Sequence, residues 1–135
     1  MGNKGNKGTR PAQTQDTLPE PKHADTAGYP VLSLRHLRNG YGVEELSDQQ
    51  RSEFLIKWAK RSQYTWAQLV THPKHGLGFE FMPEKQIKKN APENLAQDKY
   101  MVVRHQGNQP VVGFKAGDIF YALWIEATYG DIYDH

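Results

Sequence analysis

Residues 99–127, KYMVVRHQGNQPVVGFKAGDIFYALWIEA, contain three short apolar stretches separated by turn-forming residues. The first stretch, KYMVVRHQ, is followed by Gly-Asn-Gln-Pro, and the second, VVGFK, is followed by Ala-Gly-Asp. Stretches of this length, rich in β-branched and aromatic residues and bounded by Gly, Asn and Pro, are typical of strands joined by hairpin turns. The sequence therefore predicts a β-meander as the framework of the fold.

Two capping boxes mark the starts of two helices before this meander. Ser47 is followed three residues later by Gln50, and Thr65 by Gln68, a spacing that satisfies backbone amides at the first helical turn. The pattern predicts one clear helix after Ser47, a short turn and a second helix that ends at Pro73. Apolar residues recur at helical spacing in the first of them: Phe54, Leu55, Trp58 and Ala59.

The remaining segments show weaker patterns. Residues 1–28 hold one Leu and no aromatic residue, too little apolar surface to offset the entropy of ordering, so we expect a disordered tail. Residues 29–37, YPVLSLRHL, are compatible with a first strand, and residues 74–98 predict a long loop that holds one short strand. We therefore expect one α+β domain over residues 29–135, with the helical pair packed on one face of a small, mainly antiparallel sheet.

The composition restricts the chemistry. The chain of 135 residues is 37% hydrophobic and contains no Cys, which removes disulfides, zinc–thiolate sites and a cysteine nucleophile. No apolar run is long enough to cross a membrane, and the first residues lack the apolar stretch of a signal peptide. We therefore expect a cytoplasmic protein with no membrane contact.

Charge is unevenly distributed along the chain. Residues 51–89 contain eight Lys or Arg and three Glu, whereas residues 116–135 contain four carboxylates and no Lys or Arg. A basic middle and an acidic end are compatible with a face that meets a polyanion such as RNA. The other interpretation is that both regions are ordinary solvated surfaces.

Two groups of aromatic and imidazole side chains have alternative interpretations. Tyr64 and Trp66 lie at the junction of the expected helices, where they either stack on nucleobases or, as is more common, belong to the core. His72 and His75 are three residues apart, but Pro73 between them disfavours the helical geometry that would direct both imidazoles at one metal ion. We expect no metal and no other cofactor.

Phosphate-binding loops, nucleophile elbows and metalloprotease motifs are absent from the sequence. Cleavage of RNA by its own 2′-hydroxyl needs a base for that proton, an acid for the departing 5′-oxygen and a cation for the phosphate. A carboxylate, an imidazole and a guanidinium supply all three. The alternative is that Glu80 and Arg104 form a purely structural ion pair. The candidates in this chain are Glu80, Arg104, Tyr133 and His135, with Lys74 and His75 near them in the pattern.

The order of a helical pair, the motif HPKHGLGFE and a meander ending in YDH resembles the RelE/YoeB-type toxins of bacterial toxin–antitoxin modules. These toxins are small ribosome-dependent endoribonucleases. The resemblance covers residues 47–135, with Phe79 directly before Glu80 where the family has a further Pro. The residues that match the two family motifs are Pro73, Gly76, Gly78 and Glu80, then Tyr133 and His135.

The resemblance implies a RelE-like, metal-independent endoribonuclease that acts on mRNA, at the ribosome, and has a cognate antitoxin. Glu80 would be the base, His135 beside Tyr133 the acid, and Arg104 with Lys74 and Lys99 the phosphate stabilisers. The alternatives are a non-catalytic domain that binds nucleic acid or protein, and a structural domain of a mobile element. The expected RNA-binding residues are Lys57, Lys60, Arg61, Lys74, His75 and Lys99.

Overall fold

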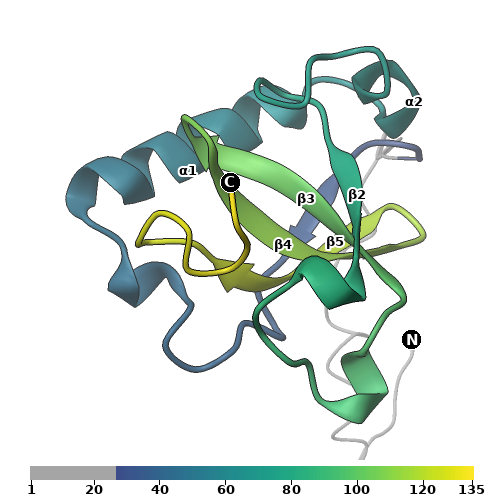
Figure 1. Cartoon of the computed structure of the whole chain (residues 1–135). Coiled ribbons are helices and arrows are strands. Elements are labelled where there is room, and N and C mark those ends of the chain that lie inside the picture. The colour runs from purple at the N-terminus through teal and green to yellow at the C-terminus, as the bar shows by residue number, and fades with distance from the viewer. Residues whose placement is uncertain (1–26) are drawn as a thin grey trace, which may run out of the picture.

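Five strands form a single mixed sheet in the computed structural model, which describes residues 27–135 (Figure 1). The strand order is β1-β5-β4-β3-β2, in which β1 runs parallel to β5 and every other neighbouring pair is antiparallel. The expected α+β class with a mainly antiparallel sheet is confirmed. The strands are β1 (Val31–Ser33), β2 (Glu80–Pro83), β3 (Lys99–Gln106), β4 (Gln109–Ala116) and β5 (Ile119–Ile125).

The meander β3-β4-β5 follows the predicted boundaries closely. Gly107 and Gly117 occupy the two turns with φ of 54° and 60°, a left-handed conformation that Gly adopts at little cost. The first turn is tighter than expected, because Gln109 and Pro110 already belong to β4. Antiparallel neighbours joined by such short turns depend on local sequence alone, which is why the pattern predicted them.

The pairing of β4 with β5 slips between Val112 and Gly113, and Gly113 then lies directly against β5. A Cβ atom added at Gly113 would lie 1.9 Å from the carbonyl oxygen of Tyr121. We expect Gly113→Ala to lower the free energy of unfolding by at least about 3 kcal/mol, measured by urea denaturation. Gly76→Ala is the control, because its added methyl group would make only an ordinary contact, 3.5 Å from the Pro73 oxygen. Equal losses in the two variants would contradict this prediction.

Both predicted helices are present, and both capping boxes are formed. α1 spans Asp48–Arg61 and α2 spans Trp66–Leu69. α2 is shorter than expected, because the chain leaves it in tighter turns before Pro73 is reached: the amides of Thr71 and His72 donate to the carbonyls three residues earlier. A residue that precedes Pro is disfavoured in the helical region, so a helix is not expected to continue through His72.

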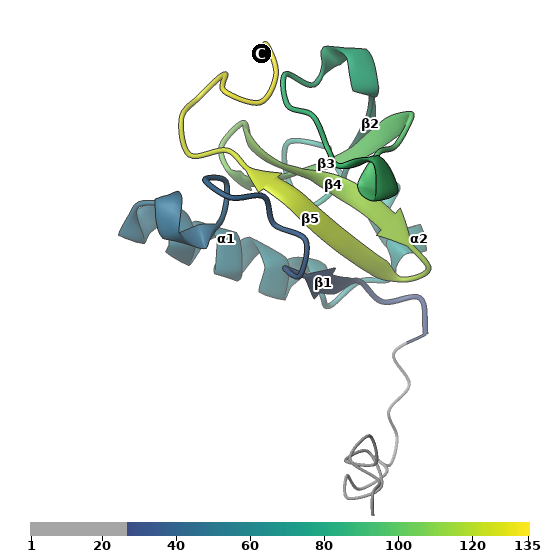
Figure 2. The same ribbon diagram turned by 90° about the horizontal axis from the view of Figure 1, so that it is seen from below.

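Each face of the sheet is covered by a different layer (Figure 2). On one face, Phe54 and Trp58 of α1 pack with Met101, Val103 and other sheet residues, so the expected helical layer lies there. On the opposite face, a second core forms between the sheet, the segment 84–98 and the C-terminal segment 128–135. This second layer contains no α-helix and was not predicted, because its residues show no periodicity.

The N-terminal part of the described chain is held at the far edge of the sheet. The expected first strand is shorter than residues 29–37, with β1 ending at Ser33. The predicted disordered tail falls outside the described residues except at its end, where the Gly28 amide donates to Asp118 Oδ2 at 2.8 Å. No helix among residues 27–135 is long and apolar enough to span a lipid bilayer.

Candidate active site

Glu80 and Arg104 meet on the sheet face that α1 does not cover. Arg104 alternates along β3 with Tyr100 and Val102 of the second core, and Glu80 lies opposite Val102 on the edge strand β2. Arg104 Nη2 lies 2.6 Å from Glu80 Oε2, and the Arg104 side chain is only 4% exposed. The sheet register therefore places a nearly buried guanidinium beside a partly exposed carboxylate.

Tyr133 reaches the same guanidinium from the C-terminal segment. Arg104 Nη2 donates to the Tyr133 hydroxyl oxygen at 3.1 Å. Burial raises the pKa of Tyr133 to about 12, so the phenol stays protonated at neutral pH and does not act as a base. Arg104 Nε and Nη1 are buried and make no hydrogen bond within residues 27–135. Two donor groups of Arg104 are therefore available to another acceptor. A buried donor without a partner costs free energy of folding.

The His135 ring lies in a stack of aromatic rings in the C-terminal segment. Its ring centroid is 3.9 Å from that of Tyr129 and 4.6 Å from that of Tyr133. Its Nε2 lies 3.0 Å from Glu126 Oε1. All four residues expected to be catalytic are therefore joined by contacts, from Glu80 through Arg104 and Tyr133 to His135.

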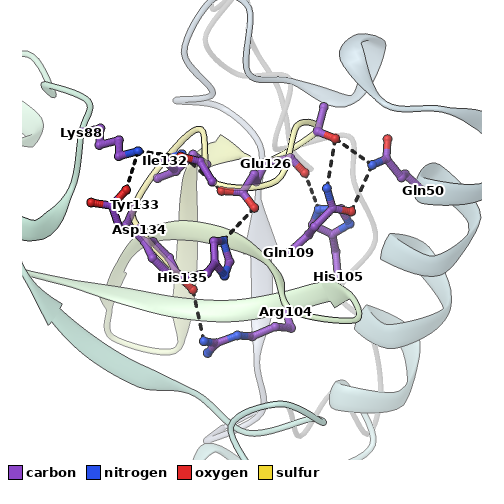
Figure 3. A network of polar contacts seen from close by, with 12 residues as sticks. Gln50, Lys88, Arg104, His105, Gln109, Glu126, Ile132, Tyr133, Asp134 and His135 are labelled. Atoms are coloured by element: carbon purple, nitrogen blue, oxygen red, sulfur yellow. Dashed lines mark hydrogen bonds and ion pairs between the residues drawn. The ribbon is translucent and has the colours of Figure 1, made fainter.

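Glu126 belongs to this site although it was not among the expected residues. Its side chain is fully buried, and Oε2 accepts the Ile132 amide at 3.2 Å while Oε1 faces the His135 ring (Figure 3). A carboxylate on one ring nitrogen fixes the orientation of an imidazole. The only signal in the sequence is a charged residue that directly follows the apolar strand β5.

Two lysines fasten the C-terminal segment to the loop after β2. Lys88 Nζ lies 2.7 Å from Asp134 Oδ1 and donates to the Gly130 carbonyl at 2.9 Å, and Lys89 Nζ lies 3.4 Å from Asp131 Oδ1. The hydrogen bond and charge of Lys88 hold the pKa of Asp134 below its usual value. Two lysines of the basic middle of the chain thus pair with two carboxylates of its acidic end.

A short loop with two glycines positions Glu80. The amides of Gly76 and Gly78 both donate to the Pro73 carbonyl, at 3.0 Å and 2.9 Å. A Cβ atom at Gly78 would lie 2.2 Å from the His72 carbonyl oxygen, so this close turn requires Gly. The motif that resembles the toxin family is therefore a compact turn that leads directly into β2.

Arg61 was expected on the RNA-binding surface, but it is only 2% exposed and does not belong to that surface. Its guanidinium donates to the carbonyls of Gly76, Leu77 and Arg104 at 2.7 to 3.1 Å. Burial, together with the charge of Arg104, lowers the pKa of Arg61 to about 10, so it remains a cation at neutral pH. Arg61 joins the glycine turn to β3 and so positions Glu80 relative to Arg104.

The other expected RNA-binding residues occupy different places. Lys74 is half exposed and its Nζ lies 3.4 Å from Glu80 Oε1, at the rim of the site. Lys60 and His75 are exposed, and Lys57 is partly buried, which lowers its pKa with help from the charge of Arg61. Lys99 begins β3, roughly 16 Å from Arg104 at the usual rise per residue, so the structure does not bring these two cations together.

Burial and the neighbouring positive charges shift the pKa of Glu80 in opposite directions. Burial alone raises its pKa, but the hydrogen bond and charge of Arg104, helped by Lys74, hold the pKa below its usual value. Glu80 is therefore ionised at neutral pH and is able to accept a proton. While it remains paired with both cations, it is a weak base.

Trp66 and Tyr64 pack in or against the core. Trp66 is 7% exposed and its Nε1 donates to the Asp118 carbonyl, so it belongs to the core and does not stack on bases. Tyr64 packs partly against that core and contacts the His72 ring. Among residues 27–135, no three His, Asp or Glu side chains gather in a group that could hold a metal ion.

His105 makes the stability of this region depend on pH. The ring is fully buried, its Nε2 donates to the Glu126 carbonyl at 2.7 Å, and its Nδ1 has no partner among residues 27–135. Burial lowers the pKa of His105 below 6.5, and the charges of Lys57 and Arg61 act in the same direction. The folded protein therefore binds this proton less readily than the unfolded chain.

We expect the free energy of unfolding to be highest above about pH 6.5 and to fall as the pH drops toward the lowered pKa, by at most about 1.4 kcal/mol per pH unit. Urea denaturation between pH 5 and pH 8 measures this slope. His105→Gln keeps a donor for the Glu126 carbonyl but does not titrate, so its slope should be smaller. Identical slopes in the two proteins would show that His105 does not contribute.

Comparison of the chain with protein-family models, with curated proteins and with solved structures found no match in any of the three. The function is therefore inferred from the residues of the site and their geometry.

Proposed function

We propose that the protein is a metal-independent endoribonuclease with a RelE-like architecture that cleaves mRNA, at the ribosome. The observation that carries this proposal is the contact network that joins Glu80, Arg104, Tyr133 and His135. These residues come from an edge strand, a central strand and the C-terminal segment, and they supply the carboxylate, guanidinium and imidazole that the reaction requires.

In the proposed reaction, the 2′-oxygen of the RNA attacks the adjacent phosphorus while its proton passes to Glu80. The bond from phosphorus to the 5′-oxygen breaks, and His135 gives a proton to that leaving oxygen. Arg104 and Lys74 stabilise the negative charge that develops on the phosphate. The products are a 2′,3′-cyclic phosphate and a free 5′-hydroxyl, so atoms and protons balance without another reactant.

The pairing of Glu80 suits a site that becomes active when the substrate binds. In the free protein, Arg104 and Lys74 hold the pKa of Glu80 low. A substrate phosphate would accept hydrogen bonds from these same two cations. Their interaction with the Glu80 carboxylate would then weaken, and the pKa of Glu80 would rise. Glu80 then becomes a stronger base only when the phosphate is in place.

The basic side chains expected from the sequence are the proposed contacts to the RNA backbone. Lys74 lies at the rim of the site, and His75 follows it, exposed, in the loop before β2. Lys57 and Lys60 belong to α1, which packs on the other face of the sheet, so they would contact RNA farther from the cleaved bond. A protein that cleaves mRNA in its own cell must be restrained, so the proposal includes a cognate antitoxin as partner.

A cleavage assay with purified protein tests the proposal. End-labelled RNA is incubated with and without ribosomes; it should be cut most rapidly when ribosomes are present, to give a 2′,3′-cyclic phosphate, and a single 2′-deoxy substitution should protect the bond beside it. RNA that stays intact under both conditions at every protein concentration would refute catalysis. Binding of RNA without cleavage would favour the alternative of a non-catalytic nucleic-acid-binding domain.

A further inference from the structure

A pocket of about 510 Å³ lies next to the candidate active site. Its wall is formed by Met82 of β2, by the following residues Lys85 to Lys88, and by Tyr133 and Asp134 of the C-terminal segment. This volume is within the range of pockets that bind small organic ligands. The pocket lies between two segments that are far apart in the chain and that Lys88 joins by its contacts with Asp134 and Gly130.

The wall combines apolar surface with polar groups that are free to bind. Met82 and Ile87 provide apolar surface, and Lys88 is already neutralised by Asp134. Lys85 and Gln86 are exposed, and neither side chain has a partner within residues 27–135. The pocket therefore offers one unpaired cation, one amide that can donate and accept, and apolar surface.

Tyr133 connects the pocket to the active site. It lines the pocket, and its hydroxyl accepts from Arg104, the proposed phosphate stabiliser. A ligand that fills the pocket beside Tyr133 is thus adjacent to the place where the cleaved phosphate would lie. A nucleotide has the matching chemistry: a flat apolar base with polar edges, and a phosphate anion.

We infer that this pocket binds one nucleotide of the RNA next to the cleaved bond. The base packs against Met82 and Ile87, Gln86 forms hydrogen bonds with its polar edge, and Lys85 binds the phosphate on the outer side. This inference rests on the proposed ribonuclease function for its substrate class. It adds a site for base recognition to the groups that carry out the chemistry.

Binding of single-stranded 2′-O-methyl RNA tests the inference, because this probe lacks the attacking hydroxyl and is not cleaved. Lys85→Glu and Gln86→Ala change exposed residues, so both variants should fold. We expect Lys85→Glu to weaken binding by about tenfold and Gln86→Ala by about threefold in fluorescence anisotropy. The matched control is Arg35→Glu, an exposed residue that follows β1 at the opposite edge of the sheet. It makes the same charge change and should weaken binding by less than about twofold.

Each outcome separates this inference from the proposed function. A selective effect of Lys85 and Gln86, with amide chemical shifts that move at Gln86 and Tyr133, supports the pocket. Equal effects of Lys85→Glu and Arg35→Glu overturn it, because they indicate general charge attraction only. If the wild type cleaves RNA and the pocket variants bind normally, the pocket inference fails and the ribonuclease proposal stands. Binding through the pocket without any cleavage supports the pocket and refutes the ribonuclease.

Discussion

Glu80→Gln and His135→Ala are each expected to lower the rate of RNA cleavage by about 10²- to 10⁴-fold, the usual contribution of a general acid or base. Gln keeps an oxygen that accepts from Arg104 but cannot take the 2′-proton. Ala at position 135 removes the proton donor to the leaving oxygen, together with the contact to Glu126. Neither change removes a Lys or Arg that attracts RNA, so affinity for RNA should change far less than the cleavage rate.

Single-turnover cleavage of a defined RNA measures the rate, and binding of 2′-O-methyl RNA measures the affinity. Glu44→Gln is the control, because Glu44 is exposed and lies outside the site. In a bacterial host, induced wild-type protein should arrest growth with loss of mRNA, and the two variants should not. Cleavage at the wild-type rate in both variants would remove Glu80 and His135 from the chemistry, and a parallel loss of affinity would give them a binding role instead.

The elements that could be predicted from the sequence are those that local interactions determine. Ser47 and Thr65 cap their helices through residues three positions later, and the turns at Gly107 and Gly117 join neighbouring strands. The parallel pairing of β1 with β5 could not be predicted, because it joins Val31 to Ile119 across most of the chain. Short strands in long-range pairs carry little periodicity of their own.

The site was predictable only in part, for a related reason. The residue types and motifs indicated Glu80 and His135, but the burial of Arg61 depends on three carbonyl oxygens that only the folded chain brings together. A basic residue on a helix is usually exposed, so sequence reasoning placed Arg61 on the surface. Glu126 was not predicted, because a carboxylate in an acidic segment is usually solvated. Its burial depends on contacts with Ile132 and His135 that only the folded chain provides.

Arg104→Met is expected to lower the cleavage rate by about 10²- to 10³-fold, because it removes the main donor to the phosphate in the transition state. We expect the free energy of unfolding to change by less than about 1 kcal/mol, an unusual result for a residue that is only 4% exposed. The reason is that Arg104 leaves Nε and Nη1 buried without partners, so its removal relieves a desolvation cost while it breaks the ion pair with Glu80. Cleavage assays and urea denaturation of the same preparations measure the two quantities.

The two measurements together separate a catalytic Arg104 from the structural ion pair that the sequence also allowed. Arg104→Lys keeps the charge but loses the planar fork that binds a phosphate through two donors, so its cleavage rate should lie between those of the wild type and Arg104→Met. A protein that carries an arginine for structure alone would lose several kcal/mol of stability in Arg104→Met while its folded fraction still cleaved RNA at the wild-type rate. A large loss of cleavage with little loss of stability would instead mean that the chain keeps two unpaired buried donors for the phosphate that they bind.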